Sequence, residues 1–370
     1  MKRRNQGLRT TRAASLALAA LMASAVAAPP ALADAVTPSW SFTNCGKAGR
    51  FGPSLADCQS AYSDKAWAQD AQQFRVVDGV QYWTVPVTAR YSVTVQGASS
   101  SGKAARFTTH VDLKAGQSLK VLVGQQPTCW QSCGGGGGTY VATSTNEPIA
   151  VAGGGGGRGR DAYSQAIGFA TPDARFVTSG GEGRGGWSRT DVQSNGGVNG
   201  QGGGSAWCGT GGGGFYGRGA GGCWGDNGGR GGRSFIEGGI GDWSQCGVED
   251  GGFGGGGAGH GCWDGGGGGG GGYSGGGGVD NGYTCGEVCA NRAAGGGGSF
   301  WAGTPAEGKS LTTGAGRVDI RFSDQATAVR ATSIGAEQVR VSWASPSDVD
   351  QAGGFVESLR VFASTDGGTT

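Results

Sequence analysis

The sequence predicts a mainly β protein, an antiparallel β-sandwich that carries a large glycine-rich insertion. Apolar and polar residues alternate in short segments such as 91–95 and 107–111, which is the period of half-buried strands. Of the chain's 85 glycines, 67 lie between Gly134 and Gly298. Alternation resumes at 317–322, after this block. We therefore expect the block, at about 134–298, to be inserted between strands of one sandwich.

The elements expected in chain order are short. Residues 56–73 read as a short helical or irregular excursion. Strands are expected around residues 40–42, 80–85, 91–95, 107–111, 119–123, 149–151 and 318–322.

The glycine block could be a flexible linker, because glycine-rich segments without a collagen period rarely bury enough apolar surface to fold. Aromatic residues and six cysteines lie between its glycine runs, however, and linkers do not carry them at this density. An ordered block must satisfy its backbone groups. Extended helices of the polyproline II class make no internal hydrogen bonds, so we expect a bundle of polyglycine II helices that bond to one another.

The ten cysteines suit a disulfide framework in an exported chain. Their spacing suggests five local pairs, although sequence alone does not fix connectivity. Zinc is the alternative, but the chain has only two histidines and neither lies near a C-x3-C pair, so we expect no metal. The proposed pairs are Cys45 with Cys58, Cys129 with Cys133, Cys208 with Cys223, Cys246 with Cys262, and Cys285 with Cys289.

Residues 1–33 read as a signal peptide, with basic residues, an apolar run at 13–28 and a small-x-small cleavage site at 31–33. The general secretory route is favoured over the twin-arginine route, because polar residues follow Arg3 and Arg4. No later segment has the apolar length of a membrane helix. We expect a secreted or cell-surface protein. A net charge of +2 gives no indication of nucleic-acid binding.

The residue pattern changes again in the segment from 324 to 370. Strands are expected at 328–334, 338–343 and 356–362, and Trp343 precedes Pro346. This pattern resembles the N-terminal half of a fibronectin type III module, with Trp343 in the position of the core tryptophan. A complete module needs about 100 residues, so the resemblance covers an incomplete β-sandwich.

Residues 39–322 resemble the extracellular glycine-rich domain of the anaplastic lymphoma kinase and leukocyte tyrosine kinase receptors. The resemblance rests most on motifs outside the glycine runs. These are residues 40–46 (WSFTNCG), 79–86 (GVQYWTVP) and 121–126 (VLVGQQ). It implies that 34–323 form a tumour-necrosis-factor-like jelly-roll sandwich bearing polyglycine helices. In those receptors the domain binds a small helical cytokine. This sequence has no kinase motif, so kinase activity is not expected.

Catalytic patterns in the sequence are weak. Residues 303–310 fit G-x-x-x-x-G-K-S, but a strand rather than a helix follows, so we interpret them as a surface turn. A calcium-binding glycine repeat at 275–280 lacks tandem copies. His110 and His260 suggest no Ser-His-Asp set. Scattered acids in loops are usually solvated, although a carboxylate pair for sugar cleavage could come from Glu237, Asp242, Glu249, Asp250 and Asp264.

The sequence thus favours an exported, non-catalytic recognition or adhesion protein without cofactor, whose partner is an extracellular protein or glycan. Trp187, Trp224 and Trp243 are the candidates for stacking on a ligand, although aromatic residues of this kind more often cap the glycine lattice as core. Two alternatives stay open: a self-associating structural protein of the cell envelope or matrix, and the non-catalytic part of a larger secreted enzyme or receptor.

Overall fold

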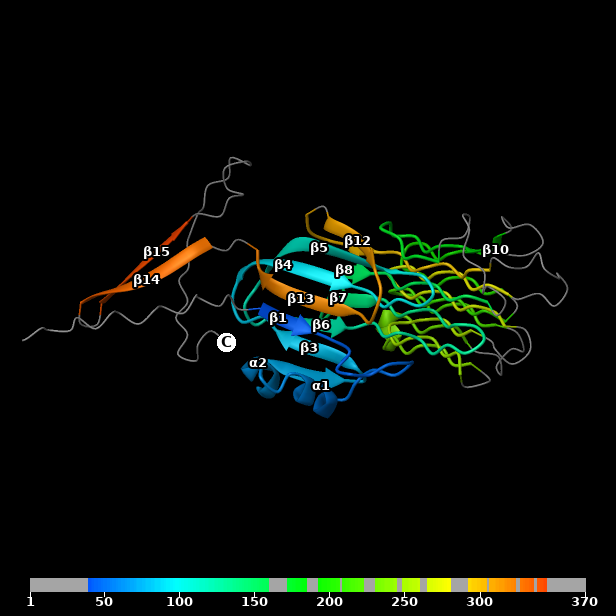
Figure 1. Cartoon of the computed structure of the whole chain (residues 1–370), viewed down its shortest axis with the longest axis horizontal. Helices are drawn as coiled ribbons and strands as arrows, with labels where there is room; N and C mark the ends of the chain where they lie inside the picture. Colours follow the sequence, from blue (N-terminus) through cyan, green and yellow to red (C-terminus); the bar gives the residue numbers. More distant parts are fainter. Residues whose placement is uncertain are drawn as a thin grey trace, which may run out of the picture.

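Two antiparallel sheets form the centre of the protein (Figure 1). The computed structural model describes residues 39–159, 172–184, 192–206, 208–222, 230–244, 248–259, 265–280, 292–304 and 306–323, and the backbone of 327–335 and 338–344. The predicted signal peptide at 1–33 lies outside these residues.

The first sheet has five strands in the order β1-β13-β4-β5-β12. Their bounds are β1 Ser39–Phe42, β4 Ala89–Gln96, β5 Ala104–Leu113, β12 Glu307–Thr312 and β13 Arg317–Phe322. The second sheet has six strands in the order β11-β8-β7-β6-β3-β2. Their bounds are β2 Phe74–Val77, β3 Val80–Thr84, β6 Ser118–Leu122, β7 Thr139–Thr143, β8 Pro148–Ala152 and β11 Phe300–Trp301.

One buried cluster joins the two sheets. Val93 of β4 and Ile320 of β13 share this cluster with Trp83 of β3 and Val121 of β6, and all four are fully buried. The alternation that predicted the strands therefore marks the residues that face the other sheet. The chain is mainly β and has the two-layer arrangement of a sandwich.

Two short helices, α1 (Leu55–Ala61) and α2 (Ala66–Gln69), lie beside β2 at one edge. Ser54 and Asp57 form a capping box at the start of α1. The Ser54 Oγ accepts from the Asp57 N–H at 3.2 Å, and the Asp57 carboxylate accepts from the Ser54 N–H at 2.9 Å. The Cys45–Cys58 disulfide ties α1 to the chain that follows β1.

The six-stranded sheet is buried on its second face as well. Leu122 of β6 and Tyr140 of β7 point to this face, where they join Phe215, Phe235 and Phe253 from the glycine-rich block. Burial on both faces explains why β7 and β8 read as continuous apolar runs instead of alternating.

The glycine-rich segments extend from one end of the sandwich as long, near-parallel chains (Figure 1). Their N–H groups bond to neighbouring segments with a repeat of three residues. Along 268–273 the six N–H groups donate at 2.8–3.2 Å, in turn, to the carbonyls of Cys133, Thr210, Gly295, Gly136, Gly213 and Gly298. The same three neighbouring segments thus recur every third residue. A strand would give a repeat of two and an α-helix one of 3.6.

These segments approach so closely that only glycine fits. A Cβ added at Gly135 would lie 2.0 Å from the Gly269 carbonyl oxygen, and one at Gly276 would lie 1.9 Å from that of Gly295. The missing side chains therefore allow the backbones to satisfy one another. The described part of the block is an ordered, hydrogen-bonded structure and not a linker.

Short elements of secondary structure interrupt the glycine-rich block. β9 (Gly183–Arg184) pairs with β10 (Val192–Ser194), and a 3-10 helix, η2, spans Phe235–Glu237. The block also contains β7 and β8, which belong to the sheet. The expectation of one insertion over 134–298 is thus corrected: a short glycine run, 134–138, precedes β7, and the longer part lies between β8 and its neighbour β11.

One further expectation is corrected, and some strands were not predicted. Residues 303–310 are not simply a turn, because β12 begins at Glu307 and pairs with β5. Strands β2 and β7 were not expected. The expected C-terminal strands do form, as β14 (Thr327–Gly335) and β15 (Gln338–Ala344), and the structure shows that they pair antiparallel. The third expected strand, at 356–362, lies outside the described residues.

Two of the five proposed disulfides are confirmed, Cys45–Cys58 and Cys129–Cys133. Cys208 is also disulfide-bonded, to a partner outside the described residues. Its pairing with Cys223 stays a prediction. The same holds for the pairs Cys246–Cys262 and Cys285–Cys289, which lie wholly outside the described ranges.

Candidate functional site

A pocket of about 360 Å³ opens where the glycine-rich block meets the chain after β1. It is large enough for a small ligand, since small-molecule pockets start at about 300 Å³. Its lining combines four arginines with one acid, one aromatic ring and two glycines. These are Arg50, Arg218, Arg230, Arg233, Asp242, Trp243, Gly231 and Gly241. We call it the arginine pocket.

Backbone hydrogen bonds hold the walls of the arginine pocket together. The Gly241 N–H donates to the Arg50 carbonyl at 3.0 Å, which joins the two sides. The Arg233 N–H donates to the Ile240 carbonyl at 3.0 Å, so the segments before and after η2 run side by side. The arginines are thus mounted on bonded backbone and not on a free loop.

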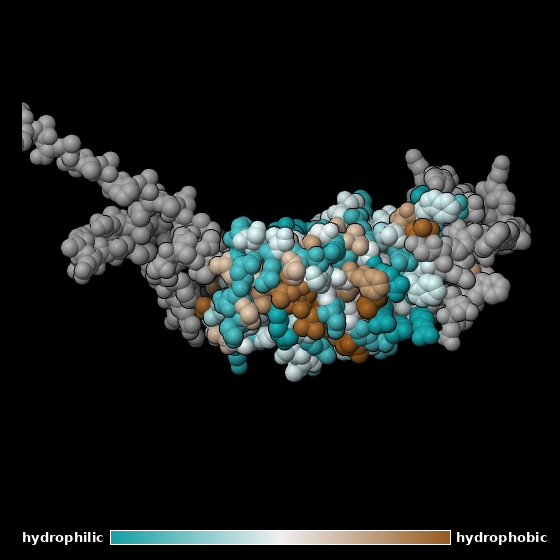
Figure 2. All heavy atoms as spheres, turned by 90° about the horizontal axis from the view of Figure 1, so that it is seen from below, coloured by the Kyte–Doolittle hydropathy of each residue, from teal (hydrophilic) through white to brown (hydrophobic). Residues whose placement is uncertain are grey.

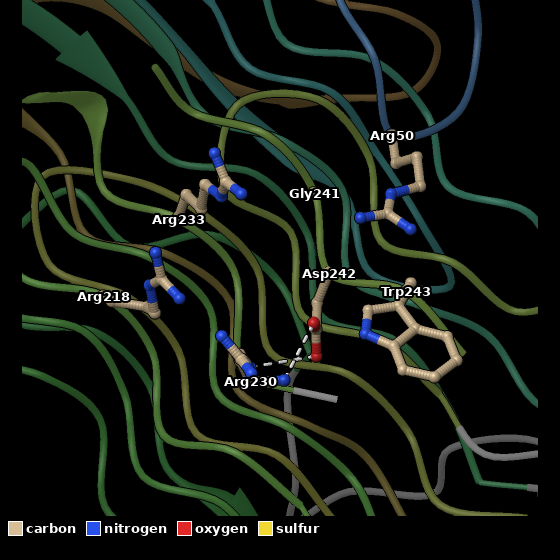
Figure 3. Close-up of a pocket in the computed structure, with 8 residues that line it drawn as sticks. Arg50, Arg218, Arg230, Arg233, Gly241, Asp242 and Trp243 are labelled. Carbon is tan, nitrogen blue, oxygen red and sulfur yellow. Dashed lines mark hydrogen bonds between the residues drawn. The ribbon is translucent and has the colours of Figure 1, made fainter. Parts of the chain in front are cut away.

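Asp242 lies at the base of the pocket and is only 4% exposed. Its carboxylate accepts from the N–H groups of Arg230 and Gly231, each at 3.1 Å (Figure 3). Burial raises the pKa of this carboxyl, and hydrogen bonds from Thr210 and from backbone N–H groups oppose the rise. Asp242 therefore fixes the segment that carries Arg230 and Arg233, while its own charge is withdrawn from solvent.

Donors approach the pocket from two sides. In Figure 3, Arg50 and Trp243 lie on one side of Asp242, and Arg218, Arg230 and Arg233 lie on the other. The indole nitrogen of Trp243 is on the edge nearest Asp242. Arg218 is paired with Glu237 at 3.1 Å.

Three of these donor groups have no acceptor among the described residues. The buried Nε of Arg50 has no hydrogen-bond partner. Within the same part of the chain, neither the Arg233 guanidinium nor the Trp243 indole N–H makes a hydrogen bond or ion pair. The described lining thus combines four arginines with one acid, Asp242, and two of these arginines, Arg218 and Arg230, have partners of their own.

Comparison with known proteins shows a partial similarity to a receptor. The chain is 34% identical over 107 residues to the leukocyte tyrosine kinase receptor of Mus musculus. The match covers 26% of this chain and 12% of the receptor. The similarity is therefore evidence about one region only, and it does not extend to the activity of the whole receptor. No protein-family model matches the chain.

The predicted stacking residues are only partly placed. Trp243 is half-buried at the arginine pocket, whereas Trp187 and Trp224 lie outside the described residues. The sequence prediction missed the arginines entirely. No local signal joins Arg50 to Arg233, because they are brought together by contacts between segments almost two hundred positions apart.

The carboxylates weighed for sugar cleavage have structural bonds. Asp250 accepts from the Ser244 N–H at 2.6 Å, and Glu249 accepts from the N–H groups of Gln131 and Ser132 at 3.2 and 3.3 Å. Asp242 and Glu237 are bonded as described above, and Asp264 lies outside the described residues. These contacts hold backbone segments in place, and of the described acids in this set only Asp242 lines the pocket.

His110 of β5 makes a contact that the sequence did not suggest. Its Nδ1 lies 2.5 Å from the Ser323 Oγ, and its Nε2 lies 3.8 Å from the Glu307 carboxylate. The second distance exceeds hydrogen-bonding range, and the Glu307 side chain is 68% exposed. The acid therefore does not orient the ring as it does in a nucleophilic triad.

The surface elsewhere mixes apolar and polar side chains. Figure 2 shows brown areas divided by hydrophilic residues on the face that carries α1 and α2. The helices that the structure describes have at most seven residues, too few to cross a bilayer. Disulfides and likeness to a receptor are consistent with a location outside the cytosol.

Proposed function

We propose that this chain is an exported, non-catalytic recognition or adhesion protein, and that its glycine-rich domain binds an extracellular protein or glycan. The observation that carries the proposal is the arginine pocket: unpaired donors are mounted on a backbone that neighbouring segments hold in place. Preorganised donors suit binding, because little order has to be gained when the ligand arrives.

The finer description of the fold belongs to the same proposal. We take the glycine segments to be polyglycine II helices, which the three-residue hydrogen-bond repeat supports. We take the sandwich to be a tumour-necrosis-factor-like jelly roll, which is supported by the repeated passage of the chain between the two sheets. Residues 34–323 would then form one domain of the anaplastic lymphoma kinase and leukocyte tyrosine kinase type, with the fibronectin-like segment as a spacer.

The similarity to the mouse receptor supports kinship of one region only. A role in recognition agrees with it, because a receptor by name binds something. The identity of the partner does not follow, and kinase activity is not proposed for this chain.

The function is tested with the purified, exported chain. Binding is measured on panels of immobilised glycans and extracellular proteins, and sedimentation velocity is recorded over a hundredfold range of concentration. We expect saturable binding to a subset of ligands by a chain that stays at one size. Concentration-dependent assembly without a partner would favour the structural-polymer alternative. Glycan turnover that a single side-chain change abolishes would contradict a non-catalytic role.

A further inference from the structure

We infer that the arginine pocket binds the carboxylate or sulfate group of an acidic sugar. The inference rests on the recognition function proposed above and names the ligand class for its site. It starts from the donors that lack acceptors, namely the Arg50 Nε, the Arg233 guanidinium and the Trp243 indole N–H. A buried donor without an acceptor is unfavourable, and an anion at this place supplies the missing acceptor.

The chemistry of the donors selects the anion. Guanidinium groups present planar forks of N–H donors that match carboxylate and sulfate oxygens, often with two parallel bonds. Because Asp242 is bonded to the backbone at the base of the pocket, it does not compete for the outer guanidinium groups. The Arg50 Nε and the Arg233 guanidinium therefore remain available to an incoming anion.

The rest of the lining favours a sugar over a peptide. Peptide sites usually combine their arginines with several buried aromatic or apolar anchors. Here Trp243 is the one apolar side chain among the lining residues, and the other non-arginine positions are Asp242 and two glycines. A volume of about 360 Å³ is the size of a small ligand and not of an extended chain. One charged sugar ring, with hydroxyls facing backbone groups and Trp243, fits this composition.

The test is a calorimetric titration of the full exported chain with glucuronic acid and with a sulfated disaccharide. Glucose is the uncharged control, because it lacks the carboxylate of glucuronic acid. We expect both acidic sugars to bind and glucose to bind at least about 10-fold more weakly, as loss of a charged hydrogen-bonding group implies. Equal binding of glucose would overturn the inference.

The site is tested with Arg50→Gln and Arg233→Gln, each of which should weaken binding of the acidic sugars by roughly 10-fold or more. Arg321→Gln is the matched control, because Arg321 is an exposed arginine of β13 outside the pocket and its loss changes the net charge equally. Unchanged thermal unfolding of each variant shows that the fold is kept.

The remaining outcomes separate the two proposals. Equal weakening by all three substitutions would mean that general charge attraction, and not the pocket, binds the sugar. If the Arg50→Gln and Arg233→Gln variants bind acidic sugars as tightly as the native chain does, the proposed site is wrong, but the recognition function still holds. Tighter binding of an oligoglutamate peptide, lost in the same two variants, would show that the ligand class is wrong. If no acidic sugar binds while another partner is captured on the panels, only this inference fails.

Discussion

Tyr140 shows how a single side chain joins the sheet to the glycine-rich block. It is fully buried on β7, and its hydroxyl lies 3.1 Å from the Gly254 carbonyl and 3.2 Å from the Gly272 carbonyl. These two glycines belong to different segments, so one phenol spans both. Burial raises the pKa of this tyrosine well above its usual value, so the hydroxyl stays protonated and available as a donor.

Replacing Tyr140 by Phe tests this junction. The ring remains but the carbonyls lose their donor, so we expect the free energy of unfolding to fall by about 1–2 kcal/mol in guanidinium titration. Tyr82→Phe is the control, since Tyr82 is half-buried on β3 and its hydroxyl makes no hydrogen bond with the described residues. An equal effect of the two substitutions would speak against the junction.

Asp57 gives an acid-dependent contribution to stability. Hydrogen bonds from the Ser54 side chain and backbone, and then the neighbouring Lys47, lower the pKa of its carboxyl from 3.8 to about 2. A lowered folded-state pKa stabilises the fold above pH 3.8, and this stabilisation is lost as the pH falls toward 2. The ionised form is the one that caps α1.

Melting temperatures between pH 5 and pH 2 measure this contribution. The native chain should lose more stability over this interval than Asp57→Asn does, because the variant has no proton to take up at that position. Asp112→Asn, on the exposed part of β5, is a suitable control for the loss of one carboxylate. Parallel pH profiles for the native chain and Asp57→Asn would contradict the assignment.

The sequence predicted only some of the residues of the candidate site. Asp242 and Trp243 are an acid and an aromatic residue among glycines. The sequence suggested sugar cleavage for Asp242 and ligand stacking for Trp243, and nothing in it linked the two. Arg50 and Arg233 carry no signal in their local sequence. Their proximity depends on backbone bonds such as that from Gly241 to Arg50, which no periodicity encodes.

Among the elements, the glycine segments depend on close contact between backbones. Gly276→Ala would place a Cβ 1.9 Å from the Gly295 carbonyl oxygen, and backbone in a bonded lattice has little room to move. We expect a loss of about 3 kcal/mol or more in unfolding free energy, or failure to fold.

Gly204→Ala is the matched control within the same block. A Cβ there would lie 3.3 Å from its nearest neighbour, the Asn195 carbonyl oxygen. Its stability should stay within about 1 kcal/mol of the native value in the same denaturant titration. Tolerance of alanine at both positions would mean that the segments are not in contact.

Strands with one buried and one exposed face were the easiest to predict. Strands β4 and β5 alternate because one of their faces is in the core and the other is polar. Strand β7 is buried on both faces and does not alternate, and it was missed, whereas its equally buried neighbour β8 was predicted from its apolar residues. Strand β2 was missed although Asp78-Gly79, with φ of 49° and 81°, is a typical hairpin turn that joins β2 to β3. Reading that dipeptide would have found it.

For the whole molecule, composition and strand pattern predicted the mainly β class and the ordered state of the glycine block. They did not predict its connectivity. The three-residue period follows from backbone geometry and is general to glycine, so the sequence of a glycine run does not say which run it bonds to. Aromatic residues between the runs, such as Phe215, Phe235 and Phe253, supply that information through long-range contacts.

The central claim is that the glycine-rich block is a fixed, mutually hydrogen-bonded scaffold, and amide hydrogen exchange tests it most directly. Peptides covering residues 251–259 and 265–279 are followed by mass spectrometry in the native, disulfide-intact chain. Because most of their N–H groups bond to other segments, we expect exchange slowed by on the order of 10³-fold or more relative to the unfolded chain. Exchange at the unfolded-chain rate in these peptides, while β4 and β5 remain protected, would contradict the account.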